Sequence, residues 1–82
     1  MASKKIIEDV WGKGKPIRGQ NPGAWRRDSE GNKIRHGSYG TDGQYGWDID
    51  HIKPSSKGGS DDLRNLQPLH HQANLEKSDK IK

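Results

Sequence analysis

Two short stretches of this 82-residue chain hold the residues best suited to chemistry. The first contains Asp48, Asp50 and His51, and the second contains His70 and Asn74, which are spaced i and i+4 as on one face of a helix. A carboxylate with an amide or imidazole, completed by water, forms a hard, oxygen-rich site that suits Mg²⁺ or Mn²⁺. Such residues are also common on ordinary surfaces, so a solvated surface remains the alternative at this stage.

The segments around these residues predict two short strands and a helix. Residues 46–50 alternate apolar and acidic side chains, as a half-buried strand does. Residues 65–69 predict a second strand that Pro68 closes. From Leu69 to about Lys77 the composition favours a helix.

Packing of this helix against the strands would bring Asp50, His51 and Asn74 together. Neighbouring residues on a strand face opposite sides, so Asp50 and His51 can serve one site only if the strand ends there. Pro54 is consistent with such an early exit.

The N-terminal half predicts a helix, a loop and a hairpin. Residues 3–13 carry apolar side chains at helical spacing and predict a short helix that Ser3 caps. Residues 14–23 hold three glycines and two prolines, which predict an irregular loop. Residues 24–28 and 33–36 flank a glycine-containing turn and predict a β-hairpin.

The composition predicts one small domain with a thin core. Apolar residues make up 26% of the chain, and phenylalanine and cysteine are absent, so disulfides and thiolate zinc sites are excluded.

No apolar run approaches the length of about 18 residues that spans a membrane, and the charged N-terminus predicts no secretory signal. A cytoplasmic protein is therefore expected. The three tryptophans argue against a wholly disordered chain.

The positive charge is concentrated in the first half of the chain. The formal net charge is +4, but residues 1–41 hold nine Lys and Arg against four Asp and Glu. Residues 42–82 hold six against seven. This asymmetry suggests a polyanion-binding surface beside a site that needs negative ligands, with a merely solvated surface as the alternative.

Residues 47–79 closely resemble the HNH endonuclease family, also called ββα-metal or His-Me finger nucleases. The agreement rests on Asp50, His51, Pro54, Ser56, Gly58, Gly59, Asn65, Leu66, Asn74 and Lys77. Residues 25–28, 31–32 and 45–47 also look like the N-terminal half of small bacterial and phage HNH proteins. The resemblance implies a single α+β domain over residues 1–82. Residues 46–79 would form the ββα-metal motif, a two-stranded antiparallel hairpin plus a helix, and residues 1–45 would add an N-terminal helix and a basic β-hairpin.

The chain departs from the family pattern in two ways. Many members bind a structural zinc through two cysteine pairs, but here Ala73 stands where one cysteine often precedes the last motif residue. No structural zinc is therefore expected, and Trp11, Trp25 and Trp47 are expected to form a core in its place. The last motif residue, often a histidine, is Asn74, whose amide oxygen can still ligate a hard cation.

The resemblance implies a metal-dependent endonuclease that hydrolyses DNA phosphodiester bonds. His51 would be the general base, because a neutral imidazole can accept a proton near pH 7. Asn65 would orient the His51 ring through a carbonyl oxygen. Asp50 and Asn74 would bind one divalent ion, with Mg²⁺ favoured over Mn²⁺, Ni²⁺ or Zn²⁺. His70 and Ser78 are candidates for outer contacts around the site.

DNA binding is expected to rest on phosphate contacts with little sequence specificity. The candidate residues are Lys13, Lys15, Arg18, Arg26, Arg27, Lys33 and Arg35. One ββα unit cuts one strand, so a lone domain would nick DNA, and double-strand cleavage would need a dimer or two independent hits. A monomer or weak dimer in a bacterial or phage-infected cell is expected. A non-catalytic nucleic-acid-binding module on a degenerate HNH fold is the alternative. A zinc-ribbon-like structural protein is disfavoured because cysteine is absent.

Overall fold

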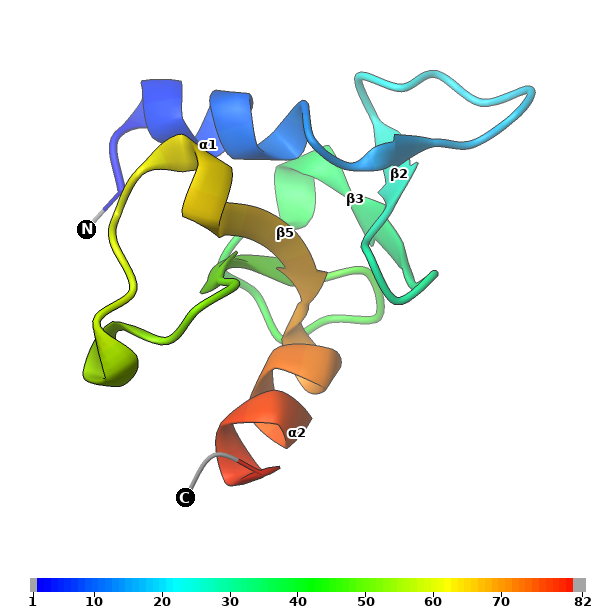
Figure 1. The fold of residues 1–82 in the computed structure, drawn as a ribbon. Helices are drawn as coiled ribbons and strands as arrows, with labels where there is room; N and C mark the ends of the chain where they lie inside the picture. The colour runs from blue at the N-terminus through cyan, green and yellow to red at the C-terminus, as the bar shows by residue number, and fades with distance from the viewer. Residues whose placement is uncertain (1, 81–82) are drawn as a thin grey trace.

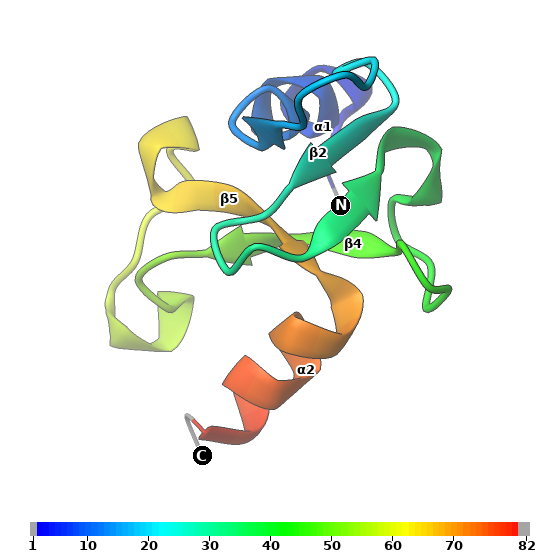
Figure 2. The same cartoon turned by 90° about the vertical axis from the view of Figure 1, so that its right-hand side faces the viewer.

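The computed structural model describes residues 2–80, with side chains described through Lys77, and this part contains two helices and two antiparallel sheets. The elements are α1 (Lys4–Trp11), β1 (Lys15–Pro16), β2 (Trp25–Arg27), β3 (Lys33–Arg35), β4 (Trp47–His51), β5 (Leu66–His70) and α2 (His71–Lys80). Short 3₁₀ turns cover His36–Ser38, Ser55–Lys57 and Leu63–Asn65. The predicted α+β class with a ββα unit is confirmed. Figures 1 and 2 show α1 and α2 at opposite ends of the molecule, with the strands between them.

The first helix forms as the sequence predicts. The Ser3 hydroxyl accepts a hydrogen bond from the backbone N–H of Ile6, and Gly12 caps the C-terminal end. The apolar stripe faces inward, with Val10 and Trp11 buried. No described helix is long and apolar enough to cross a membrane.

The predicted hairpin is present, and it belongs to a three-stranded sheet in the order β1-β2-β3. The irregular loop predicted over residues 14–23 was partly wrong, because Lys15–Pro16 pairs with β2 as a short third strand. Pro16 and Arg26 are cross-strand partners, and Arg26 is opposite Ile34, so these three residues share the inner face. Ile34 on that face is completely buried.

Asp28 fastens the hairpin turn to the rest of the fold and is 1% exposed. One carboxylate oxygen accepts hydrogen bonds from the backbone N–H groups of Glu30 and Asn32. The other accepts from the Asn32 amide and from the backbone N–H of His70, at 3.1 and 2.9 Å. A single buried carboxylate therefore joins the N-terminal hairpin to the end of β5.

The second sheet pairs β4 with β5, and Asp50 lies opposite Gln67 in its register. The prediction that Pro68 closes the second strand was wrong, because Pro68 lies inside β5 opposite Ile49. β5 pairs on one side only, and such an edge strand tolerates a residue without an N–H. The helix consequently begins at His71 instead of Leu69.

Two of the three tryptophans form the core. Trp11 and Trp47 are buried with ring centroids 5.3 Å apart, and they pack with Val10, Ile34 and Leu66. Trp25, which was predicted to join them, lies instead on the outer face of its sheet because strand residues alternate between faces and Arg26 takes the inner position.

Candidate active site

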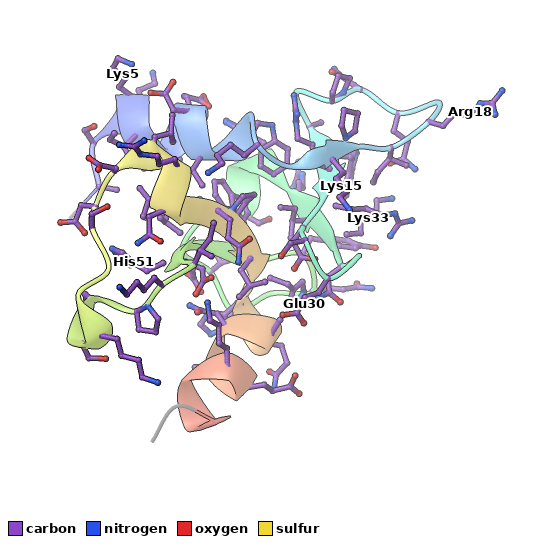
Figure 3. The ribbon with its side chains drawn as sticks, viewed as in Figure 1. Lys5, Lys15, Arg18, Glu30, Lys33 and His51 are labelled. Carbon is purple, nitrogen blue, oxygen red and sulfur yellow. The ribbon has the colours of Figure 1, made fainter. Side chains whose placement is uncertain are left out.

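The predicted general base, His51, and the two predicted ion ligands, Asp50 and Asn74, meet at a hollow of about 270 Å³ between β4, α2 and the loop that follows β4. The hollow is lined by Ile49, Asp50, His51, Pro54, Ser55, Ser56, Asn74 and Lys77. His51 is the last residue of β4, so the strand ends where a shared site requires it to end. Figure 3 shows His51 beside the loop, away from the basic hairpin.

Asp50 is held at the base of this hollow by two side chains. Its exposed fraction is 6%, and its Oδ2 atom accepts hydrogen bonds from Gln67 Nε2 at 2.9 Å and Lys77 Nζ at 2.7 Å. Lys77 also donates to the backbone oxygen of His51 at 2.9 Å. The ammonium group compensates the buried carboxylate, and the two contacts through Oδ2 leave Oδ1 as the acceptor for a further ligand.

His51 interacts with a carboxylate that the sequence did not single out. Its Nε2 atom lies 2.7 Å from Oδ1 of Asp61 in the loop between the strands. A carboxylate only accepts hydrogen bonds, so Nε2 carries a proton in this contact, and a neutral His51 ring has its lone pair on Nδ1. His51 also lines a second groove of about 540 Å³ on the α1 side, together with Ile6 and Asp61.

Asn65 has contacts different from those predicted. Its Oδ1 accepts from the backbone N–H of Lys53 at 2.9 Å, and its Nδ2 donates to the backbone oxygens of Lys53 and Ser60. Its own backbone oxygen accepts from Ile52 N–H at 2.8 Å. Both carbonyl oxygens of Asn65 are thus bonded to backbone amides and not to the His51 imidazole. Asn65 joins the two ends of the loop, and the loop presents Asp61.

Two adjacent glycines complete this loop. Gly58 has a φ of +85°, which favours glycine over residues with a Cβ atom. Gly59 donates its backbone N–H to the oxygen of Pro54 at 2.9 Å, and a Cβ atom there would lie 1.8 Å from the Lys53 oxygen. The loop can therefore close tightly only with glycine at this position.

Asn74 enters the hollow from α2 and is linked to Asp48. Oδ2 of Asp48 accepts from His71 Nδ1 at 2.8 Å and lies 3.4 Å from Asn74 Nδ2. Donation through Nδ2 leaves Oδ1 as the acceptor atom of the Asn74 amide. The predicted alternation of β4 holds, since Asp48 and Asp50 both contact α2 while Trp47 and Ile49 pack toward the core.

The oxygen donors in the hollow suit a hard cation. The described residues contain no group of three or more His, Cys, Asp or Glu side chains that could hold a metal ion. Mg²⁺, however, is often bound through one or two protein oxygen ligands together with water and substrate phosphate. One carboxylate from Asp50 and one amide oxygen from Asn74 fit that pattern.

Two predicted outer contacts remain to be placed. His70 does not line the hollow: its Nδ1 accepts from the backbone N–H of Gln72, and its Nε2 lies 2.7 Å from the Gln44 oxygen. Its ring thus joins the start of α2 to the loop before β4. The side chain of Ser78 lies outside the described residues.

Three residues at the site, Gln67, Lys77 and Asp61, were not predicted from the sequence to have roles there. Cross-strand register could have revealed Gln67, and helical spacing from Asn74 could have indicated Lys77. No local pattern indicates Asp61, because the loop fold alone brings it to His51.

The predicted DNA-binding residues divide into two sets. Arg26 lies inward, where its guanidinium donates to the backbone oxygens of Pro22 and Gly14 and lies 5.8 Å from the Trp11 ring centroid. Lys13 donates to the backbone oxygens of Leu63 and Leu66. Both side chains therefore stabilise the fold through hydrogen bonds to backbone oxygens. The others are on the outer strand face or in the connecting loop, and they are Lys15, Arg18, Arg27, Lys33 and Arg35.

Comparison with known proteins identifies the family. Residues 31–80 match the family described as HNH endonuclease, and this range includes β4, β5, α2 and the hollow. No curated protein and no solved structure matches the chain. Because the match covers more than half of the sequence, the chain belongs to the HNH endonuclease family, a family of nucleases.

Proposed function

We propose that this protein is a metal-dependent endonuclease that hydrolyses DNA phosphodiester bonds. The observation that carries the proposal is the convergence of Asp50, His51 and Asn74 on one hollow in a chain of the HNH family. Hydrolysis needs an activated water, relief of phosphoryl charge and a stabilised leaving oxygen. These three residues supply the protein part of each requirement.

In this proposal His51 is the general base. With its Nε2 proton directed to Asp61, the lone pair on Nδ1 can take a proton from the attacking water. The Asp61 carboxylate then stabilises the imidazolium that forms, as a carboxylate beside a catalytic histidine does. In this proposal Asp61 takes the orienting role that the family resemblance implied for Asn65.

Asp50 and Asn74 are the proposed protein ligands of one divalent ion, with Mg²⁺ favoured. When bound, such an ion neutralises charge on the phosphoryl group and on the leaving oxygen. Gln67 orients the Asp50 carboxylate through its Oδ2 atom, whereas the Lys77 ammonium bonded to the same atom would compete electrostatically with a bound ion. One such site cuts one strand, so the proposed product is a nick.

A plasmid assay tests the proposal. Supercoiled DNA is incubated with the wild-type protein and Mg²⁺, Mn²⁺ or Ni²⁺, and conversion to the open-circle form is followed. His51→Ala should reduce the nicking rate by about 10²–10⁴-fold, as expected for loss of a general base. His36→Asn is the matched control, since His36 pairs with Glu8 outside the hollow.

The outcomes separate the two functions considered. If the wild type binds DNA but never nicks it with any of these ions, the protein is a non-catalytic nucleic-acid-binding module. If His51→Ala nicks at the wild-type rate, His51 is not the general base even though the activity exists.

A further inference from the structure

The outer face of the three-stranded sheet carries a row of three cations. Lys15 on β1 is the register partner of Arg27 on β2, and Arg27 is the partner of Lys33 on β3. Register partners point to the same face of a sheet, and like charges directly opposite one another are destabilising. Arg35 lies on the same face, two residues beyond Lys33 along β3.

No described carboxylate pairs with this row. The ion pairs of the described residues use none of Lys15, Arg27, Lys33 and Arg35. Asp28 follows Arg27 directly in the sequence, but its carboxylate is buried. It accepts hydrogen bonds from Glu30, Asn32 and His70 and from none of the four cations. A self-repelling row that the fold leaves uncompensated is a surface suited to an extended anion.

Aromatic rings hold one of these cations in place. The Lys33 ammonium lies 4.3 Å from the Trp25 ring centroid and 5.8 Å from that of Tyr45. The two rings pack edge to face, with centroids 5.0 Å apart. Cation–aromatic contacts restrict a lysine side chain that would otherwise be mobile, so the charge is partly positioned before a ligand arrives.

A groove lies between this face and β5 of the ββα unit. It has a volume of about 130 Å³, and its lining includes Lys13, Lys15, Arg27 and Gln67. Lys15 and Arg27 belong to the cationic row, while Gln67 donates to the Asp50 carboxylate. Figure 3 shows Lys15, Lys33 and Arg18 on one side of the molecule, with His51 on the other side.

We propose that the outer face of the sheet, formed by Lys15, Arg27, Lys33 and Arg35, binds the sugar-phosphate backbone of DNA. The groove beside Gln67 would receive the neighbouring part of the strand. The choice of DNA as the polyanion rests on the proposed function, and the row of cations without a carboxylate partner among the described residues supports it. Arg26 and Lys13 are excluded from this surface because their cations bind backbone oxygens of other segments, whereas Arg27 donates only within its own hairpin, to the Gly31 oxygen at 3.0 Å.

Salt-dependent binding tests the surface without relying on catalysis. The double variant Lys15→Gln/Lys33→Gln is made in a His51→Ala background, and its binding to a labelled DNA duplex is measured with chelator by fluorescence anisotropy. Each phosphate contact on duplex DNA contributes about 0.9 to the magnitude of the slope of log K against log salt. The loss of two such contacts should therefore reduce the magnitude of that slope by about 1.8.

The matched control is Lys4→Gln/Lys5→Gln, which removes the same charge from α1. Figure 3 places Lys5 away from the cationic row. A slope that falls for the sheet variant and stays unchanged for the α1 variant supports the surface. Equal slopes for both variants, or no change in either, overturn it.

Thermal unfolding verifies that both variants are folded. Because no step of this experiment needs cleavage, its result does not depend on the nuclease proposal. A protein that binds DNA through this face but never nicks it would refute the activity and leave the surface intact.

Discussion

The imidazole of His51 and the carboxylate of Asp61 form a hydrogen-bonded pair, with Nε2 and Oδ1 2.7 Å apart. The two residues come from different parts of the ββα unit, since His51 ends β4 and Asp61 follows the two glycines of the loop. Asn65 fixes the loop through three hydrogen bonds of its amide, and this places the carboxylate beside the ring. The orientation of the proposed base thus depends on the loop and not on β4 alone.

Asp61→Ala should lower the kcat for nicking by about 10–100-fold, because the imidazole loses the partner that selects its tautomer. KM should change little, since Asp61 is not proposed to contact DNA. Nitrogen NMR of the histidine ring should show a smaller population with the proton on Nε2. Asp62→Ala is the control, because among the described residues this neighbouring carboxylate has a single hydrogen bond, accepted from the Ser60 hydroxyl at 3.3 Å. Identical kinetics and ring spectra in the two variants would contradict the positioning role.

Asp50→Asn should abolish the stabilisation that Mg²⁺ or Mn²⁺ confers on the folded protein. An ion at about 100 times its Kd stabilises a single-site protein by about 2.7 kcal/mol, which thermal unfolding detects readily. The shift between chelator and added ion is compared within each variant, so a changed baseline stability does not matter. Asp42→Asn removes an exposed loop carboxylate and is the control. A wild-type-sized shift in Asp50→Asn would refute Asp50 as a ligand.

Lys77→Met should separate stability from ion affinity. The apo protein should lose about 1–3 kcal/mol of unfolding free energy, because the buried Asp50 carboxylate loses its compensating ammonium. The divalent ion should bind several-fold more tightly, because a positive charge next to its proposed ligand is gone. Chemical unfolding and ion titration measure the two effects. Weaker ion binding in Lys77→Met would show that the lysine supports the site instead of competing for the carboxylate.

Asp28→Ala should destabilise the whole domain by about 2–4 kcal/mol. Four hydrogen-bond donors, from Glu30, Asn32 and His70, would lose one buried acceptor group. Urea unfolding measures the loss, and Asp28→Asn should recover part of it because one oxygen remains. Asp42→Ala should change stability by less than about 0.5 kcal/mol. If Asp28→Ala changed the unfolding free energy as little as Asp42→Ala does, the turn would not depend on the Asp28 carboxylate.

Gly59→Ala should impair nicking by disturbing the loop that carries Asp61. The added Cβ atom would lie 1.8 Å from the Lys53 backbone oxygen, so the backbone must move. Gly37→Ala is the control, since a Cβ atom there meets nothing within 4 Å. Nicking rates and ring NMR of His51 are compared for both. A Gly59→Ala protein with wild-type activity would show that the loop tolerates this movement.

Local patterns were sufficient for the helices, the hairpin and most of the candidate site. The alternation in β4 placed Asp48 and Asp50 on one face, and the spacing along the last helix placed Asn74 near them. These features are local because they follow from the periods of a strand and a helix. The errors at Pro68, Leu69 and Lys15 arose where pairing with a distant strand outweighed local propensity.

The sequence by itself determined the family motif, the residues of the proposed ion site and the excess of cations in the first half. Only the tertiary structure decided which of those residues are free to act. It turned Arg26 inward and Lys15 outward, bonded Asn65 to backbone amides, and brought Asp61 to His51. The physical reason is that a polar or charged side chain forms hydrogen bonds with the backbone or carboxylate oxygens that lie close to it. Which oxygens lie close is set by packing between segments far apart in the chain.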